Sequence, residues 1–293
     1  MATLLDEAVA RRRFSSGYGR HRVQLISGLV VITVVAVCSL LAPLLAPYDP
    51  ILTDPTAKFL PPASPGHLLG TDELGRDLLS RLLWGGRTSL LLAVAAVAAA
   101  TVLGSSAALA AGFAGPRLSG LIMRVVDVLF AFPVILVAIA LAALLRPGAG
   151  VVVFAIGFAV VPYITRVVFA EVKQQRGREY VEAAVSLGAG RWSLTVREVL
   201  PNVVGPIVVY ATSLVGAMVV FSASLSAVGI GVQPPAPDWG QMIASGAKVV
   251  ISGHLYVALI PGLTVLLVAL AFNWLGDGLN DVFDPRSRRG ARR

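Results

Sequence analysis

The chain has 293 residues, of which 56% are hydrophobic and only 14% are charged. Soluble domains carry about 25% charged residues, so this composition excludes an ordinary soluble protein and indicates helices that pack in lipid. The net charge of +8 and the pI of about 10.2 do not require a nucleic-acid partner, because basic loops on the cytoplasmic side of a membrane explain them.

Six apolar stretches are long enough to cross a membrane as helices, which takes about 20 residues each. We expect them at Val23–Ala46, Ser89–Gly112, Leu121–Leu145, Val151–Ala170, Val203–Val228 and Leu255–Trp274. The first is longer than the apolar part of a signal peptide, which has about 7–15 residues, so it is interpreted as an uncleaved anchor. The single cysteine, Cys38, lies in it and can form no disulfide within the chain.

Basic residues set the expected orientation. With the N-terminus in the cytoplasm, 18 of the 24 Lys and Arg residues fall on that side, which predicts that both termini are cytoplasmic. The chain then divides into a cytoplasmic tail (1–22), a first anchor (23–46), an extracytoplasmic loop (47–88), a five-helix core (89–275) and a basic cytoplasmic tail (276–293). A polar cytoplasmic loop, 171–202, interrupts the core.

Several features inside the spans suggest contacts. In the second span a small residue recurs every four positions, which permits close packing within the chain or between subunits: Ala96, Ala100, Gly104, Ala108 and Gly112. In the third span Arg124 and Asp127 are expected to form an ion pair, and Phe132-Pro133 should bend the helix. In the fifth, Ser213, Gly216 and Ser224 share a face that either packs against another helix or lines a transport pathway.

The extracytoplasmic segments carry further signals. Residues 77–84 predict a short helix on the outer membrane surface, in which Asp77 and Arg81 have the spacing of a helical ion pair. That helix is either structural or a contact for an extracytoplasmic binding protein. Asp238 is expected to cap a helix, and Trp239 to anchor it at the membrane interface.

Motifs for common enzyme chemistry are missing. The three lysines and three histidines lie in no phosphate-binding loop and no zinc-protease pattern, and no G-x-S-x-G nucleophile elbow occurs. We therefore expect no enzyme activity and no bound cofactor or metal. An intramembrane enzyme is disfavoured, and energy for any active process must come from a partner or a gradient.

The polar loop predicts two amphipathic helices joined by glycines. Glu179, Glu182 and Ser186 share one face of the first, whose apolar face comprises Tyr180, Val181, Ala184, Val185 and Leu187. Gly188 and Gly190 supply the turn. The second has an apolar stripe of Trp192, Val196 and Val199, and Pro201 should end it. Such a hairpin suits a groove on a soluble partner or the lipid headgroup layer.

The stretch "EAAVSLGAGRWSLTVREVLP" resembles the EAA loop of ABC-importer permease subunits. Glu182, Ala183, Ala184, Gly188, Arg191, Leu200 and Pro201 fall in this loop. Glu198 departs from the pattern, which has an aliphatic residue there.

Four further stretches resemble the dipeptide/oligopeptide and nickel branch of this family, of the second-permease (C) type. They are "LGTDELGRDLLSRLLWGGRTSL", "MRVVDVLFAFP", "GVQPPAPDWGQMI" and "LAFNWLGDGLNDVFDPR".

The resemblance implies an all-α protein with six transmembrane helices and the type I ABC-importer permease fold, in a bacterial cell membrane. It implies a second homologous permease, two ATP-binding subunits or domains that bind ATP and Mg, and an extracytoplasmic substrate-binding protein as partners. Peptides are the expected substrate and nickel the alternative. The loop 171–202 would couple to the ATPase, and Asp238 and Trp239 would belong to an outer gate. The rival is a stand-alone secondary carrier, which would show inverted repeats and mid-membrane acids.

Overall fold

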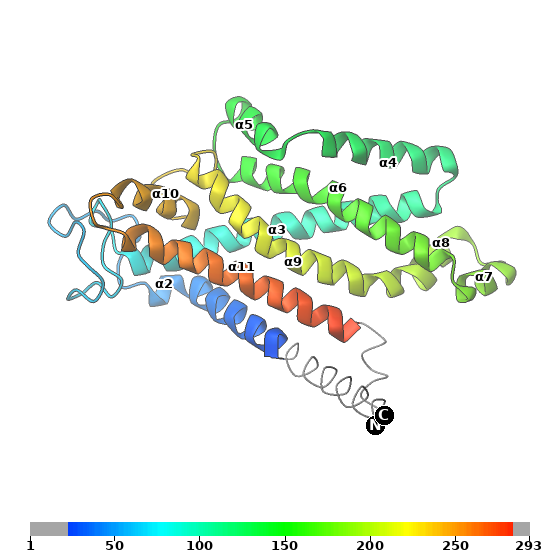
Figure 1. Ribbon diagram of the computed structural model, residues 1–293, viewed down its shortest axis with the longest axis horizontal. Coiled ribbons are helices and arrows are strands. Elements are labelled where there is room, and N and C mark those ends of the chain that lie inside the picture. Colours follow the sequence, from blue (N-terminus) through cyan, green and yellow to red (C-terminus); the bar gives the residue numbers. More distant parts are fainter. Residues whose placement is uncertain (1–22, 284–293) are drawn as a thin grey trace, which may run out of the picture.

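The computed structural model describes residues 23–283, and these residues form helices and two isolated bridges but no strand (Figure 1). Five helices are long and apolar enough to cross a membrane, and a bent helix pair makes a sixth candidate span. The predicted all-α architecture with six spans is therefore confirmed. The predicted tail 1–22 and residues 284–293 of the basic tail lie outside the described residues.

Most helices are joined by short connections. The longest loop, residues 46–77, lies between α2 and α3. The first helix, Val23–Leu40, is followed by the single turn α2. The full set is α2 (Ala42–Leu45), α3 (Leu78–Phe113), α4 (Pro116–Ala131), α5 (Val134–Leu145), α6 (Ala149–Arg176), α7 (Glu179–Ser186), α8 (Arg191–Ser193), the π-helical segment η1 (Leu194–Val199), α9 (Leu200–Ala227), α10 (Trp239–Val249) and α11 (Tyr256–Phe283).

The start of α3 corrects the prediction of a separate surface helix at 77–84. Asp77 caps α3, because its carboxylate accepts hydrogen bonds from the Ser80 amide and hydroxyl, each at 2.7 Å. From Leu78 the helix runs unbroken into the second span. Asp77 therefore does not pair with Arg81. The Arg81 guanidinium is buried and instead lies 3.5 Å from the Asp72 carboxylate and donates to the Pro50 carbonyl at 3.1 Å.

The third span is broken where the sequence predicts a bend. α4 ends at Ala131 and α5 begins at Val134, with an angle of 81° between them, because Pro133 offers no N–H to continue the helix. The expected Arg124–Asp127 pair is wrong. Asp127 pairs with Arg166 of α6, and Arg124 is exposed. Sequence spacing favoured the neighbour on the same helix, whereas packing brings α6 closer to the carboxylate.

Pro201 does not end a helix, contrary to expectation. Residues Arg191–Ala227 form one continuous helix in which Pro201 is among the first residues of α9. The preceding turns, Leu194–Val199, are π-helical. We attribute the continuity to this wider turn, because a proline ring crowds the carbonyl four residues earlier and a π segment gives that carbonyl more room.

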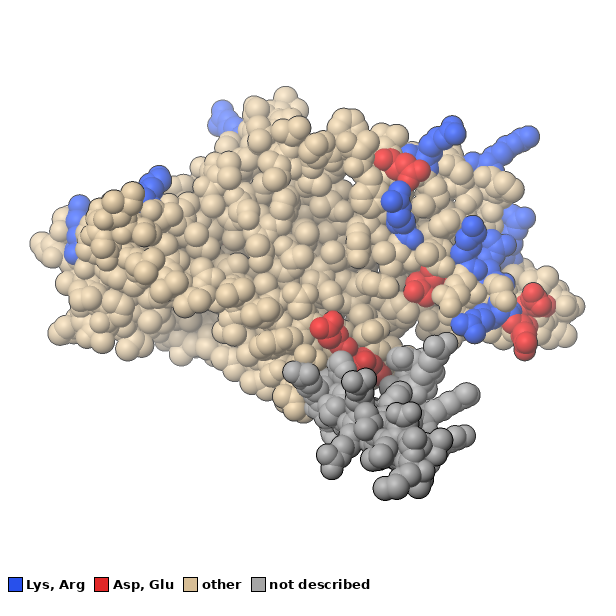
Figure 2. Space-filling view, viewed as in Figure 1, with Lys and Arg blue, Asp and Glu red and all other residues tan. Residues whose placement is uncertain are grey.

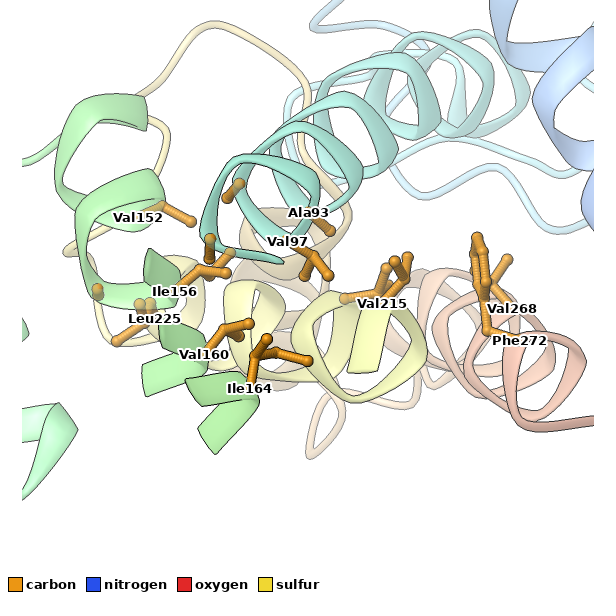
Figure 3. Close-up of a cluster of buried hydrophobic side chains, with 14 of the residues drawn as sticks. Ala93, Val97, Val152, Ile156, Val160, Ile164, Val215, Leu225, Val268 and Phe272 are labelled. Carbon is orange, nitrogen blue, oxygen red and sulfur yellow. The ribbon is translucent and has the colours of Figure 1, made fainter. Parts of the chain in front are cut away.

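The core lies between α3, α6, α9 and α11, with aliphatic side chains from each helix meeting at the centre (Figure 3). The small-residue ridge of α3 is buried and packs against α6 within the chain, as predicted. At Gly104 the backbones nearly touch, since a Cβ there would lie 2.9 Å from the Val161 carbonyl oxygen and 3.0 Å from Ile164 Cγ2. This close approach lets α3 and α6 form the most extensive helix contact of the structure.

The long loop before α3 is held by buried charges at the end of the molecule that also carries α10 (Figure 1). Asp72 accepts hydrogen bonds from the Arg76 amide at 3.0 Å and from Arg76 Nε at 2.7 Å. His67 Nδ1 lies 2.9 Å from Asp77, and Phe59 stacks on His254 with ring centroids 4.0 Å apart. These contacts fix the loop against the ends of α3 and α11.

A substitution at the α3–α6 contact tests this packing. Gly104→Ala should destabilise the protein by about 1–3 kcal/mol, because the added methyl group forces the two backbones apart. Thermal unfolding of the purified protein in detergent measures the effect. Gly120→Ala on α4 is the matched control, since a Cβ there meets nothing within 4 Å. Equal melting temperatures for the two variants would contradict the assigned contact.

Candidate functional site

The candidate site is the hairpin predicted at 171–202, which lies at the end of the molecule opposite α10 (Figure 1). It is shorter than predicted, because α6 continues to Arg176 and the helix that becomes α9 already starts at Arg191. Between them stand the two-turn helix α7 and a short turn. The hairpin thus continues two of the spans, with α7 as its only separate helix.

The turn after α7 is a Schellman motif, in which the chain reverses at a left-handed residue. Gly188 has φ +82°, and its amide donates to the Val185 carbonyl at 2.9 Å. The Ala189 amide donates to the Ala184 carbonyl at 3.0 Å. Both bonds satisfy carbonyls that the helix end leaves free. Glycine suits this position because an L side chain in the left-handed region is strained.

One face of the hairpin packs onto the core. Val181 of α7 is buried together with Leu194 and Val199 of the following helix, and Ala184 and Ala189 lie partly buried against them. These small and branched side chains bring α7 close to the π segment. The hairpin is therefore packed against the spans rather than separate from them.

Tyr180 links the three parts of the hairpin. Its hydroxyl lies 3.0 Å from Gln175 Oε1 at the end of α6 and accepts a hydrogen bond from Asn202 Nδ2 of α9 at 3.4 Å. Asn202 also donates to the Glu198 carbonyl at 2.7 Å, at the position that departs from the family pattern. Partial burial raises the pKa of the Tyr180 phenol above its ordinary value.

The residues predicted for coupling divide between two faces. Ala184 and Leu200 face the core and are partly buried. The others are exposed: Glu182, Ala183, Gly188, Arg191 and Pro201. Among the exposed members, Glu182 makes a local hydrogen bond, in which its carbonyl accepts from the Ser186 hydroxyl at 2.9 Å.

Three residues of the predicted apolar faces are exposed on this chain. Leu187 is 88% exposed, Trp192 is 80% exposed and Val185 is 55% exposed. The Schellman turn causes this for Leu187, because the residue caps α7 where the chain begins to reverse. The turn itself was predicted from Gly188, one position later.

The predicted pathway residues of α9 do not share one environment. Ser213 and Gly216 pack against α11, since a Cβ on Gly216 would lie 2.8 Å from the Ala269 carbonyl oxygen and Gly276 contacts Ser213. Ser224 is exposed, and its hydroxyl donates to the Val220 carbonyl at 2.9 Å. Helix packing thus accounts for the first two residues.

Asp238 caps α10 as predicted, by accepting a hydrogen bond from the Gln241 amide at 3.2 Å. Trp239 is not an interface anchor, because only 1% of it is exposed. Its indole donates to the Leu82 carbonyl at 2.9 Å, and its ring occupies a notch in α3 where a Cβ on Gly86 would lie 2.7 Å away. Ser89 donates to Asp238 at 2.7 Å. These contacts join α10 to α3.

Basic side chains gather at the hairpin end. On the face shown in Figure 2, most of the visible Lys and Arg side chains lie near α7 and α8, and few lie at the opposite end. The hairpin itself carries Lys173, Arg176, Arg178, Arg191 and Arg197. No group of three His, Cys, Asp or Glu residues that could hold a metal occurs within residues 23–283.

The sequence matches two known families. Residues 100–289 match the family described as binding-protein-dependent transport system inner membrane component. Residues 18–62 match the N-terminal transmembrane domain of oligopeptide transport permease C. Together these matches include the hairpin and every described span except residues 78–99 of α3.

Curated relatives cover nearly the whole chain. A di/tripeptide transport system permease protein of Pseudomonas aeruginosa is 41% identical over 278 residues, which are 92% of this chain and 91% of that protein. A probable D,D-dipeptide transport system permease protein of Escherichia coli is 36% identical over 89% of this chain and 87% of its own length. A glutathione transport system permease protein of Pectobacterium atrosepticum is 38% identical, with coverages of 94% and 91%.

The turn offers a test with a built-in control. Gly188→Ala should destabilise the helix end by about 1–2 kcal/mol through backbone strain alone, because a Cβ there meets nothing within 4 Å. Exchange of the Ala189 amide with deuterium should then accelerate about 5–30-fold. Gly190→Ala should leave exchange unchanged, since Gly190 has φ −71° and equally open surroundings. Equal acceleration in both variants would contradict the strained turn.

Proposed function

The chain belongs to the family of binding-protein-dependent transport system inner membrane components, and on this premise we propose that its hairpin couples a peptide pathway to separate ATPase subunits. As a member of this family it is a multi-pass permease subunit of an ABC importer in the bacterial inner membrane. The observation that carries the proposal is the exposed apolar side chains on a hairpin that continues two spans.

Peptides are the proposed substrate. The three relatives described above are named for di- and tripeptides, D,D-dipeptides and glutathione, which is itself a tripeptide. These names share small peptides, and none of the three is named for nickel. We therefore favour peptides over the nickel alternative.

The proposed assembly contains partners that this chain does not supply. A second homologous permease would complete the pathway, and two ATP-binding subunits or domains would bind ATP and Mg. An extracytoplasmic binding protein would deliver the substrate, as the name of the family implies. In this assembly the chain itself binds no nucleotide and carries out no catalysis.

The surface proposed to dock the ATPase consists of Val185, Leu187 and Trp192. These three side chains project from α7 and the start of the next helix, where they are flanked by the charged residues Glu182 and Arg191. Aromatic and aliphatic anchors with a charged rim are typical of protein interfaces. A short helix presented this way suits a groove on the partner.

The basic side chains near the hairpin indicate how the protein is oriented in the membrane. The concentration of basic side chains around the hairpin supports a cytoplasmic position for this end, and hence for both termini. The loop before α3 and α10 would then face the outside, where a binding protein arrives. ATP-driven closure of the ATPase subunits would move α7 and, through it, the inner ends of α6 and α9.

A binding experiment tests the docking surface. Leu187→Ala and Trp192→Ala should each weaken ATPase association at least about tenfold, because truncation of an interface anchor costs more than about 1.4 kcal/mol. Binding of the ATPase subunits to the permease pair in nanodiscs measures the effect. Leu44→Ala, which removes an 81% exposed leucine from α2, is the control and should bind normally.

Two outcomes would contradict the proposal. In the first, Trp192→Ala binds the ATPase normally but the protein is less stable in the membrane. This result would mean that the hairpin lies on lipid headgroups. Peptide uptake by vesicles that contain the permeases and no ATPase subunit would mean that the chain acts as a secondary carrier.

A further inference from the structure

An ion pair joins α4 to α6 inside the membrane-spanning part of the molecule. Arg166 Nη2 contacts Asp127 Oδ1, and the Arg166 guanidinium also lies over the Phe130 ring, 4.5 Å from its centroid. Both partners of Arg166 therefore come from α4. The coupling hairpin uses none of these three residues.

The pair lies near the inner ends of its two predicted spans. Arg166 stands four residues before Ala170, where the fourth span is predicted to end, and Asp127 stands six residues after Leu121, where the third is predicted to begin. With a rise of about 1.5 Å per residue, the two positions are about 6 and 9 Å inside those predicted boundaries.

The two charges are open to their surroundings. The Arg166 side chain is 54% exposed and the Asp127 side chain is 58% exposed, so this chain does not cover them. Charged side chains at this depth are rare on lipid-facing surfaces and instead face water or protein. The exposed face of α6 continues with Tyr163 and Lys173, on the same side as Arg166 by helical spacing.

Other exposed helix faces in the described part of the chain differ from this one. α11 exposes Leu259, Leu263, Leu266 and Leu270, and α3 exposes Leu91, Val94, Val102 and Leu103. These aliphatic stretches suit lipid tails, and towards its C-terminal end the α11 stripe continues with the exposed polar residues Asn273 and Asp277. The face formed by α4 and α6 also exposes apolar residues such as Leu121 and Val125, but it is distinguished by an exposed ion pair between two helices.

We propose that Asp127 and Arg166 line a water-filled pathway and form a contact site for the charged ends of a passing peptide. This inference rests on the proposed function. Arg166 would receive the peptide carboxylate and Asp127 the peptide ammonium group. Each charge then exchanges one partner for another, so the peptide is held without a large gain in affinity, as transport requires.

An accessibility experiment tests the position of the pair without depending on transport. In a Cys38→Ala background, Asp127→Cys and Tyr163→Cys are introduced one at a time into the complete complex in proteoliposomes. An anionic methanethiosulfonate should label both positions at least tenfold faster than Val102→Cys on α3, which is 66% exposed. Labelling no faster than at Val102→Cys would overturn the proposal, even if peptide transport itself is confirmed.

A transport experiment tests the contact with the peptide. Asp127→Asn should lower uptake of a dipeptide with free termini at least tenfold, and should lower the uptake ratio of that dipeptide to its N-acetylated form. Arg166→Gln should do the same for the free relative to the C-amidated form. The control is Arg124→Gln, which removes an exposed charge from the same helix and should transport normally.

The ratios separate a contact from a structural link. If the pair merely held α4 against α6, both variants would slow free and blocked peptides equally, and the exchanged pair Asp127→Arg with Arg166→Asp would restore uptake in full. Either result would overturn the peptide contact. The binding protein is the same in all samples. Its own preference between free and blocked peptides therefore cancels when the uptake ratio of each variant is divided by that of the parent permease.

Discussion

The close contact between α3 and α6 is the interaction on which the rest of the structure depends. Apolar side chains gain little by leaving lipid tails, so helices in a membrane associate through close backbone approach and van der Waals packing. The small residues of α3 permit this approach, and Gly104 brings the helix against the Val161 carbonyl of α6. α9 packs against both helices, and α11 packs against α9. Without the first contact there is no fixed groove in which α9 can lie.

The same arrangement determines how the hairpin is attached. α7 packs against the end of α6 and against the π segment, and its Schellman turn leads into a helix that continues without interruption to Ala227. A displacement of α7 therefore reaches α9 through a continuous helix, and reaches α6 through the Tyr180–Gln175 hydrogen bond and the buried Val181. The π segment is the one irregular part of this connection, and π turns are frequent where helices serve a function.

Local sequence signals predicted the elements well, and contacts between distant residues account for what they missed. The spans, the break at Pro133, the turn at Gly188 and the Asp238 cap each depend on residues a few positions apart. The partner of Asp127 is 39 positions away, and the notch for Trp239 lies about 150 positions earlier in the chain, so neither follows from spacing. The buried surface around Leu78 and Arg81 likewise becomes apparent only when the outer loop is in place. Pro201 was misjudged because a widened turn, which no sequence rule marks, accommodates it.

The two ends of the molecule are held in different ways, and this difference bears on the mechanism. At the α10 end, buried ion pairs and the Trp239 contact tie the loop, α3 and α10 together. At the other end α7 packs against the end of α6 and the π segment, Arg176 donates to the Gly112 carbonyl of α3, and the apolar residues of the hairpin are exposed. A force applied at α7 therefore meets least resistance at the inner ends of α6 and α9, while their outer ends stay with α3 and α10. Arg166 lies on α6 between the two regions, so movement of the inner end of α6 relative to α4 would separate it from Asp127. The pair is thus placed where opening of the inner end and release of a charged solute would coincide.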